Sequence, residues 1–252
     1  MTHGSLVDSI IMEVESFLGK AHHMTLSLSS RPLDDEEREV YERRLKSLIV
    51  EGMPSTWLKS LSRKRLSKFD SLMMLVRARI GEYGVDEERG LRSRLTSVAL
   101  KSIEDARVEY LVASPSIDED KIVSMGFMGN DWQSRLWSDK FNLYWNVREC
   151  VLRSLALSHG AIRMREEIER IVLRSKHAME RLERTESSRV RNACVIKVLS
   201  KARIREYSIE VKGDCPLCKL YEGSVFKTKD AMQGLNAPPF HPGCACLVRG
   251  VV

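Results

Sequence analysis

Two short stretches, Asp214-Cys215-Pro216-Leu217-Cys218-Lys219 and Phe240-His241-Pro242-Gly243-Cys244-Ala245-Cys246, decide the local fold near the end of this sequence. A C-x-x-C turn presents two sulfur atoms to one ion, and a second cluster across a loop supplies the remaining ligands of a tetrahedral zinc site. Five residues compete for the four positions. We favour Cys215, Cys218, His241 and Cys246, and Cys244 is the alternative that can replace Cys246 or His241.

The spacing of these ligands favours a structural zinc ion over a catalytic one. A catalytic zinc keeps an open coordination position with an acid–base group nearby. Asp214, Glu210 and Glu222 are close in sequence, but none lies in an H-x-E or H-E-x-x-H pattern. Bound zinc contributes on the order of 10 kcal/mol to a segment this short. The alternative without metal, in which the thiols are packed or paired, leaves the folding of this apolar-poor segment unexplained.

The composition predicts a mainly helical, soluble protein. The chain has 252 residues, of which 30% are charged and 6% aromatic, and its net charge is +6. The longest apolar run, Leu72-Met73-Met74-Leu75-Val76, is far too short to span a membrane, and no secretory signal is visible. Cys150 and Cys194 lie in helical patterns, which predicts buried thiols. The basic excess is compatible with a nucleic acid or another acidic partner.

Apolar periodicity divides the chain into two regions. Residues 1–115 are predicted to be a run of helices, with a helix end at Gly81 and Gly84 before Asp86 caps the next helix. The boundary is placed at Ser114-Pro115-Ser116. Region 116–252 begins with further helices, and its second long helical stretch, from about Ala161 to Lys201, is expected to bend or break between residues 181 and 185.

After Lys201 the period of the pattern changes from helix to strand. Tyr207, Ile209 and Val211 alternate with polar residues, which predicts a half-buried strand. Val225-Phe226 and Leu247-Val248 are predicted as further short strands. We therefore expect a mainly α (α+β) fold, with a helical N-terminal region, long helices and a small zinc-stapled module that contains β-strands.

A basic stretch in the first region is a candidate contact for nucleic acid or for an acidic protein face. Such a cluster can neutralise DNA phosphates, although a solvated helix face is the favoured interpretation. The stretch consists of Lys59, Arg63, Lys64, Arg65 and Lys68.

Arg184-Thr185-Glu186 offers a second candidate, because an arginine and a glutamate two apart also occur in active sites. The structural interpretation is favoured. Glu186 and Arg189 are three residues apart on a helix and can pair, and Thr185 can start or cap a helix. We find no phosphate-binding glycine loop, nucleophile elbow or paired catalytic carboxylates in the sequence, so no catalytic residues are predicted.

The order of these features resembles the phage Mu protein F-like domain of tailed-phage minor head proteins, the phage head morphogenesis family. The resemblance covers roughly residues 126–248. The segments that carry it are Trp132-Gln133-Ser134-Arg135-Leu136-Trp137 with the later Gly160, Arg184-Thr185-Glu186-Ser187-Ser188-Arg189, Asp214-Cys215-Pro216-Leu217-Cys218-Lys219-Leu220-Tyr221-Glu222-Gly223, Val225-Phe226, and Pro238-Pro239-Phe240-His241-Pro242-Gly243-Cys244-Ala245-Cys246. The chain departs from the family at Ala245, where an arginine is frequent, and around Tyr207 to Ile209, where a tryptophan is common.

The resemblance implies a structural minor capsid protein and not an enzyme. Such a protein associates with the portal protein and other head proteins during procapsid assembly. It is synthesised in the host cytoplasm and resides in the virion, in the capsid interior or at the portal vertex. Two alternatives remain open, a nucleic-acid-binding zinc module that contacts packaged DNA and, with less support, a zinc-dependent hydrolase or nuclease.

Overall fold

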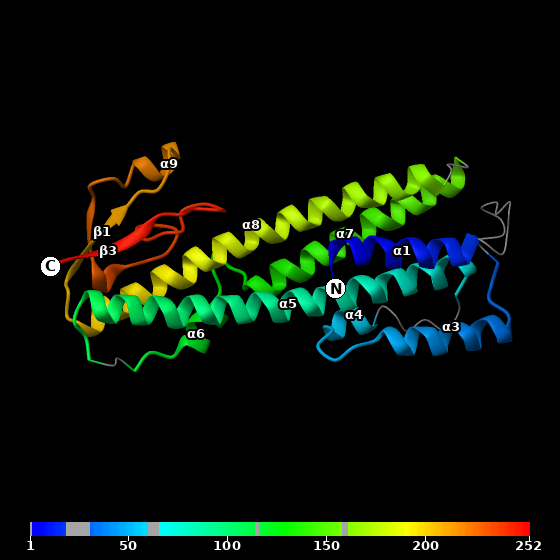
Figure 1. The fold of residues 1–252 in the computed structure, drawn as a ribbon, viewed down its shortest axis with the longest axis horizontal. Coiled ribbons are helices and arrows are strands. Elements are labelled where there is room, and N and C mark those ends of the chain that lie inside the picture. Colours follow the sequence, from blue (N-terminus) through cyan, green and yellow to red (C-terminus); the bar gives the residue numbers. More distant parts are fainter. Residues whose placement is uncertain (1, 19–30, 60–65, 114–115, 158–160) are drawn as a thin grey trace. The chain divides into compact units, whose positions relative to one another are not determined.

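The computed structural model describes residues 2–18, 31–59, 66–113, 116–157 and 161–252. Within these ranges the chain is mainly helical and carries one small antiparallel sheet, which confirms the predicted mainly α (α+β) fold (Figure 1). No helix in the described ranges is long and apolar enough to cross a membrane. The elements are α1 (His3–Leu18), α3 (Asp35–Leu48), α4 (Ser55–Lys59), α5 (Lys68–Glu109), α6 (Glu119–Ser124), α7 (Trp132–Ala156), α8 (Ala161–Lys201), β1 (Glu206–Glu210), α9 (Pro216–Lys219), β2 (Val225–Lys227), the 3-10 helix η1 (Thr228–Asp230) and β3 (Leu247–Val251).

The chain forms two compact units, and each unit contains residues from both sides of residue 115. The first consists of Met1–Glu88 and Trp137–Ala178, and the second of Arg89–Leu136 and Met179–Val252. The long helices α5, α7 and α8 each contribute residues to both units. The predicted boundary between regions 1–115 and 116–252 therefore does not separate the two compact units. That region 116–252 corresponds to a family domain stays a prediction.

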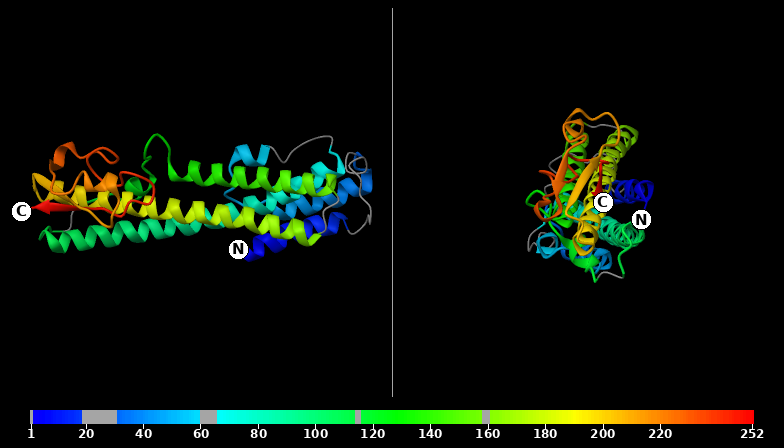
Figure 2. Two further views of the ribbon diagram at one scale, coloured as in Figure 1. Left: turned by 90° about the horizontal axis from the view of Figure 1, so that it is seen from above. Right: turned by 90° about the vertical axis from the view of Figure 1, so that its left-hand side faces the viewer.

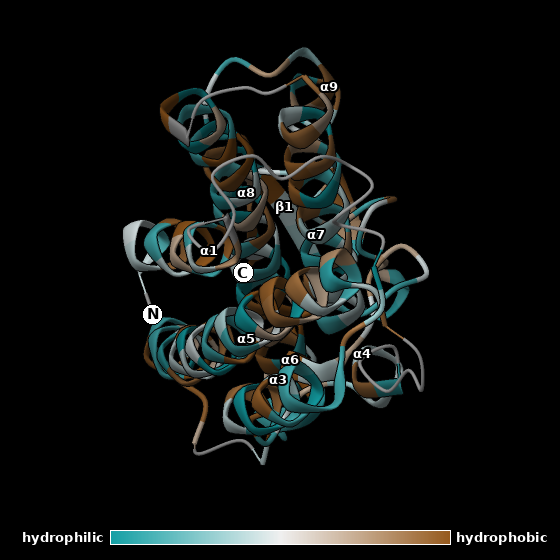
Figure 3. Ribbon diagram, turned by 90° about the vertical axis from the view of Figure 1, so that its right-hand side faces the viewer, coloured by the Kyte–Doolittle hydropathy of each residue, from teal (hydrophilic) through white to brown (hydrophobic). Residues whose placement is uncertain are grey.

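The first unit packs helices around a continuous apolar core. In α1, residues Leu6, Ile10 and Val14 recur at helical spacing and are fully buried against apolar residues of α5, α7 and α8. Burial of one such side chain contributes about 1.5–3 kcal/mol. Figure 3 shows hydrophobic and hydrophilic residues along α1 and α5, and the start of α5 is buried over the consecutive apolar residues 72–76. Asp34 and Glu37 form a capping box that starts α3, in line with the predicted acidic first turn.

Helix α5 corrects the predicted helix end at Gly81 and Gly84. The helix runs without interruption from Lys68 to Glu109. A Cβ atom on Gly84 would lie 3.1 Å from the Trp137 ring and 3.2 Å from Cγ of Lys140, and one on Gly81 would lie 2.6 Å from Nε1 of Trp57. Both glycines make room for packed side chains, which outweighs a helix-propensity cost of about 1 kcal/mol each.

A buried ion pair lies inside the first unit. The Lys140 side chain is fully buried, and its Nζ is 2.5 Å from Glu87 Oε2 on α5 and 3.0 Å from Asp139 Oδ2. It also donates a hydrogen bond to Ser175 Oγ on α8 at 3.0 Å. A charge in the interior is tolerated only where its partners are in place, so this cluster favours one alignment of the three helices.

The second unit carries the sheet, whose strand order is β2-β1-β3 with antiparallel pairing throughout. All three predicted strands are present. Tyr207 and Ile209 of β1 point into the core, as their alternation predicts, and pack with Leu199 of α8 and Val248 of β3. The sheet lies beside the last turns of α8 (Figure 2).

Side chains from α8 and from the turn after α5 cover the outer edge of β3. The Val248 N–H donates to Asn192 Oδ1 at 2.8 Å, and the Gly250 N–H donates to the Tyr110 hydroxyl at 2.9 Å. Gly250 is required at this approach, because a Cβ there would lie 2.6 Å from a Leu199 methyl carbon. Backbone groups that an edge strand normally exposes are thus satisfied within the unit.

Candidate metal centre

Two short turns in the second unit shape the candidate ligand clusters. Cys215 precedes the one-turn helix α9, and the Lys219 N–H donates to the Cys215 carbonyl at 3.1 Å, which turns the chain back beneath Cys218. In the second cluster the Cys244 N–H donates to the His241 carbonyl at 3.1 Å. Gly243 lies between them with a φ of 77°, a left-handed conformation that suits glycine.

The ligand atoms form two overlapping groups that share Cys218. The first group is Cys215, Cys218 and His241, the second is Cys218, Cys244 and Cys246, and the atoms of each lie within 4.8 Å of one another. His241 Nε2 is 3.3 Å from the Cys215 sulfur and 3.1 Å from the Cys218 sulfur, and the Cys218 and Cys244 sulfurs are 3.8 Å apart. Tetrahedral zinc, with bonds of about 2.0–2.3 Å, places its ligand atoms roughly 3.5–3.8 Å apart. The cluster can therefore hold a metal ion.

All five predicted ligands belong to these two groups, and the choice between Cys244 and Cys246 for the fourth position stays open. Cys244 lies at the sulfur–sulfur distance expected in a zinc tetrahedron. The Cys246 sulfur accepts a hydrogen bond from the backbone N–H of Lys212, the kind of outer contact that supports metal ligands. Both side chains are buried. The preference for Cys246 stays a prediction.

The ring of His241 is oriented for metal binding through Nε2. Its Nδ1 is 3.0 Å from the Pro242 carbonyl oxygen, which can only accept a hydrogen bond. The proton of the neutral ring is therefore on Nδ1, and the lone pair is on Nε2, which faces the sulfurs of Cys215 and Cys218. A histidine ligand that donates its second ring N–H to a backbone carbonyl is typical of metal sites.

The surroundings of the thiols determine their protonation before a metal binds. The backbone N–H of Cys218 donates to the Cys215 sulfur and lowers the pKa of Cys215, partly opposed by burial. Burial raises the pKa of Cys218, and the hydrogen bonds that its thiol donates to neighbouring cysteine sulfurs add to this. Burial likewise raises the pKa of Cys246. A divalent cation reverses the preference for the neutral form, so binding releases protons and weakens in acid.

A polar stripe on α8, formed by Thr185, Arg189 and Asn192, holds the ligand-bearing segment. The Thr185 hydroxyl accepts the Gly243 N–H at 2.8 Å, inside the second cluster. The Arg189 carbonyl accepts from the Gln233 side chain at 2.7 Å. The fully buried Asn192 donates to the Cys246 carbonyl at 3.0 Å and accepts the Val248 N–H. The three residues recur at helical spacing, so one face of α8 positions the segment.

The predicted pairing of Glu186 with Arg189 on one helix is confirmed. Both side chains are buried, and Arg189 Nε is 2.5 Å from Glu186 Oε2. Arg189 also donates to the carbonyls of Ile122 and Val123 at the end of α6, at 2.9 and 3.0 Å. Arg135 pairs with the other oxygen of Glu186 at 3.0 Å. All these groups are engaged in holding α6 and α7 against α8.

Helix α8 also corrects two expectations about its middle. It is continuous from Ala161 to Lys201, so no break occurs between residues 181 and 185. Thr185 neither starts nor caps a helix; its hydroxyl donates to the Arg181 carbonyl at 2.7 Å within the helix. A buried threonine in this position bonds the preceding turn and the Gly243 N–H at once, which leaves the helix intact.

Stacked aromatic rings join the two ligand clusters. The rings of Tyr221, which follows the first cluster, and Phe240, which precedes the second, are 3.9 Å apart between centroids and nearly parallel. Both pack in the apolar core that contains Tyr207, Ile209 and the cluster cysteines. Packing in this core explains why the two ligand clusters lie close together although residues 222–239 separate Tyr221 from Phe240.

The other sequence predictions lie away from this centre. Cys150 and Cys194 are buried free thiols, as predicted, and burial raises their pKa to about 11 and about 12. Of the basic stretch, Lys68 pairs with Glu37 at 2.5 Å, and Lys59 is exposed. Residues 63–65 of this stretch lie outside the described residues.

Asn192 is the positioning residue that the sequence analysis missed. A signal was present, because asparagine is unfavourable inside a helix unless its side chain has a specific hydrogen-bonding task. Its partners Cys246 and Val248 are 54 and 56 residues away in sequence, beyond the reach of periodicity arguments.

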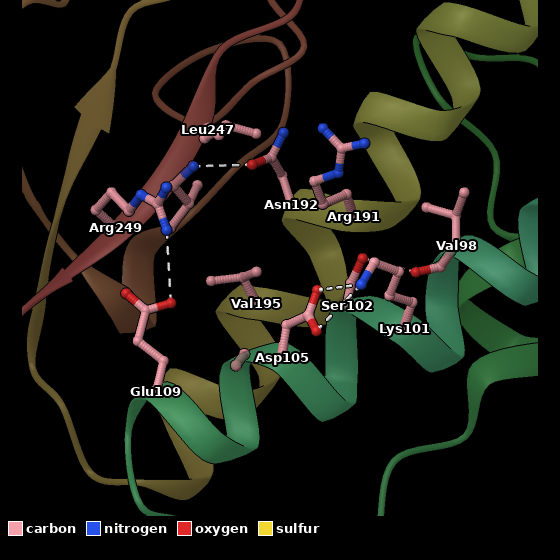
Figure 4. Close-up of a pocket in the computed structure, with 12 residues that line it drawn as sticks. Val98, Lys101, Ser102, Asp105, Glu109, Arg191, Asn192, Val195, Leu247 and Arg249 are labelled. Carbon is pink, nitrogen blue, oxygen red and sulfur yellow. Dashed lines mark hydrogen bonds and ion pairs between the residues drawn. The ribbon is translucent and has the colours of Figure 1, made fainter.

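A cavity of about 310 Å³ lies beside Asn192, between α5, α8 and β3 (Figure 4). Its lining includes the apolar side chains of Val98, Val195 and Leu247. The charges on its rim are mostly paired within the protein, Lys101 with Asp105 and Arg249 with Glu109. The side-chain amide of Asn192 is also hydrogen-bonded within the protein. The cavity therefore offers few polar groups that could bind a ligand.

Comparison with known proteins does not place this chain in a family. No protein-family model, no curated protein and no solved structure matches it.

Proposed function

We propose that this chain is a structural minor head protein of a tailed phage or prophage, which acts in head morphogenesis and associates with the portal during procapsid assembly. The observation that carries the proposal is the linkage between segments on which the family resemblance rests. Thr185 of the Arg184–Arg189 segment holds the Gly243 N–H between His241 and Cys244. Arg189 of the same segment and Arg135 of the Trp132–Trp137 segment both pair with Glu186.

The metal in this proposal is a structural zinc ion. Cys215, Cys218 and His241 provide three ligands, and Cys244 or Cys246 provides the fourth. Three thiolates with one imidazole form a donor set that suits zinc. The nearby carboxylates Glu210 and Asp214 are engaged in ion pairs with Arg249 and Lys219, at 2.7 and 2.9 Å. This gives less support to a zinc-dependent hydrolase than to a fold-stabilising ion.

Metal analysis of the purified chain tests the zinc site. We expect about one zinc per chain in the wild type, and strongly reduced zinc in Cys215→Ser and His241→Ala. Cys244→Ser and Cys246→Ser identify the fourth ligand, since only one of them is expected to lower the zinc content to the same degree. Cys150→Ala, a buried thiol outside the cluster, is the matched control. Absence of zinc, or unchanged zinc in Cys215→Ser, would overturn the assignment.

Association with the portal tests the role in assembly. We expect the chain to co-purify with the portal protein encoded in its genomic neighbourhood and to be present in purified phage particles at low copy number. The Glu186→Gln variant, which disturbs the buried ion network, is expected to reduce incorporation into particles. A neighbourhood without any portal gene, or particles that lack the chain, would count decisively against the proposal.

A further inference from the structure

Five basic residues gather where α8 ends and the sheet begins. Lys201 is the last residue of α8, Arg203 and Arg205 lie in the connection to β1, Lys227 ends β2, and Lys229 belongs to η1. All five side chains are exposed. They come from two parts of the sequence that lie on either side of the first ligand cluster. The sequence therefore shows no continuous basic stretch that predicts this surface.

Backbone pairing brings the two parts together. The Thr228 N–H donates to the Arg205 carbonyl at 2.8 Å, and Glu206 is paired with Lys227 in the β1–β2 register. Arg205 is therefore hydrogen-bonded to Thr228, the residue that lies between Lys227 and Lys229 in the sequence. Lys201 is four residues before Arg205 along the chain. Positive charges on neighbouring backbone positions repel one another, since salt screens them only beyond about 8–10 Å.

The five basic side chains have no hydrogen-bond or ion-pair partner among the residues that the structure describes. Other basic residues of the same module are paired: Lys219 with Asp214 at 2.9 Å and Arg249 with Glu210 at 2.7 Å. The carboxylates nearest in sequence, Glu206 and Asp230, leave an excess of three positive charges, five minus two. Such an excess is unfavourable in the free protein and is offset when an anion binds.

Arg203 provides an independent observation. Helix α8 ends with the Ile204 N–H bonded to the Leu199 carbonyl at 3.0 Å and the Arg203 N–H bonded to the Ser200 carbonyl at 3.3 Å. This is a Schellman ending, and Arg203 occupies its left-handed position with a φ of 59°. Glycine is the usual residue there, and an arginine is strained. A strained residue that glycine would relieve points to a task for its side chain.

We propose that these five residues, Lys201, Arg203, Arg205, Lys227 and Lys229, form a surface that binds the phosphate backbone of double-stranded DNA without regard to sequence. Lysine and arginine contacts to phosphates position a protein on DNA but do not read bases. The aromatic residues next to the surface face the core, since Tyr207 is buried and the half-buried Phe226 packs against it. Base stacking, which single strands require, has no platform here. This inference is separate from portal association, and either can fail alone.

Fluorescence anisotropy with a labelled duplex of about 20 base pairs tests the surface, using the full chain loaded with zinc over a series of salt concentrations. Each phosphate contact contributes about −0.9 to the slope of log affinity against log salt, so five contacts give a slope of about −4 to −5. The triple variant Lys201→Gln, Arg203→Gly, Arg205→Gln is expected to flatten the slope by roughly 3 and to weaken binding at least about tenfold.

The matched control removes three exposed cations that are ion-paired elsewhere, through Arg43→Gln, Lys101→Gln and Arg170→Gln. It lowers the net charge equally, and its slope is expected to stay within about one of the wild type. A second readout comes from Arg203→Gly alone. It is expected to flatten the slope by about one while the unfolding midpoint stays at or above that of the wild type, because glycine suits the left-handed position.

Several outcomes would overturn the inference. These are a wild-type slope near zero, equal losses in the triple variant and its control, or tighter binding of single-stranded than of double-stranded DNA. Binding to vesicles that contain phosphatidylserine, without binding to DNA, would show that the surface recognises a membrane instead and would also overturn it.

Discussion

Asn192→Leu is the substitution that tests most directly whether α8 positions the metal-binding segment. Leucine keeps the size of the side chain but removes its hydrogen-bonding groups. The Val248 N–H and the Cys246 carbonyl, bonded to Asn192 at 2.8 and 3.0 Å, then lose their partner. A buried backbone group without a partner costs about 1–3 kcal/mol, so the two cost about 2–6 kcal/mol. Leucine returns roughly 0.5 kcal/mol through its better helix propensity. The expected net loss is about 2–5 kcal/mol.

Urea unfolding of the zinc-loaded protein measures this loss, with circular dichroism for the helices and a chromogenic zinc chelator for the metal module. The two probes are needed because the two compact units need not unfold together. We expect the zinc-release transition of Asn192→Leu to move to lower urea. Asn142→Leu makes the same chemical change at an exposed position of α7 and serves as the control. If both variants stay within about 0.5 kcal/mol of the wild type, Asn192 does not hold the segment.

Three further predictions concern the rest of the fold. Glu186→Gln is expected to lower the free energy of unfolding by about 3–5 kcal/mol, because Arg189 keeps a buried charge without its partner; a loss below about 1 kcal/mol in urea unfolding contradicts this. Gly84→Ala is expected to cost about 1–3 kcal/mol, since its Cβ would meet a tryptophan ring at 3.1 Å. Gly90→Ala, which faces only the end of a flexible side chain, is expected to gain up to about 1 kcal/mol, and equal midpoints for the two variants refute the packing argument. Burial raises the pKa of Cys194 from 9.0 to about 12, so the native state retains a proton that the unfolded state releases; this contribution is complete below pH 9 and is lost as the pH rises towards 12. Cys194→Ala is expected to flatten the fall in stability between about pH 8 and 10, measured by urea unfolding with a reductant, and an unchanged slope argues against it.

What could be predicted from the sequence depends on the distance between the residues that act together. The alternation at Tyr207 and Ile209 predicts β1, and the Cys/His spacing predicts the ligand clusters, because each signal is complete within a few residues. The prediction that Gly84 ends a helix is wrong, because this glycine makes room for Trp137, which is 53 residues later in the sequence. The same holds for Asn192, whose partners follow only after the whole metal-binding segment.

The basic surface could not be predicted from the sequence either. Lys201, Arg203 and Arg205 are spaced too loosely to stand out in the sequence, and Lys227 and Lys229 join them only through the β1–β2 register. The denser basic stretch, by contrast, includes Lys68, which is paired with Glu37. Charge density along the chain is therefore a poor guide to charge density in space.

The covered edge of β3 has a consequence for the behaviour of the protein at high concentration. The same Asn192 side chain that bonds the Cys246 carbonyl also occupies the Val248 N–H. If the proposed zinc ion is bound, its loss would release the ligand segment, loosen this side chain and uncover strand residues that can pair with another chain. Demetallated protein is then expected to form intermolecular β-structure and not merely to unfold. The proposed zinc ion would then protect the protein from aggregation.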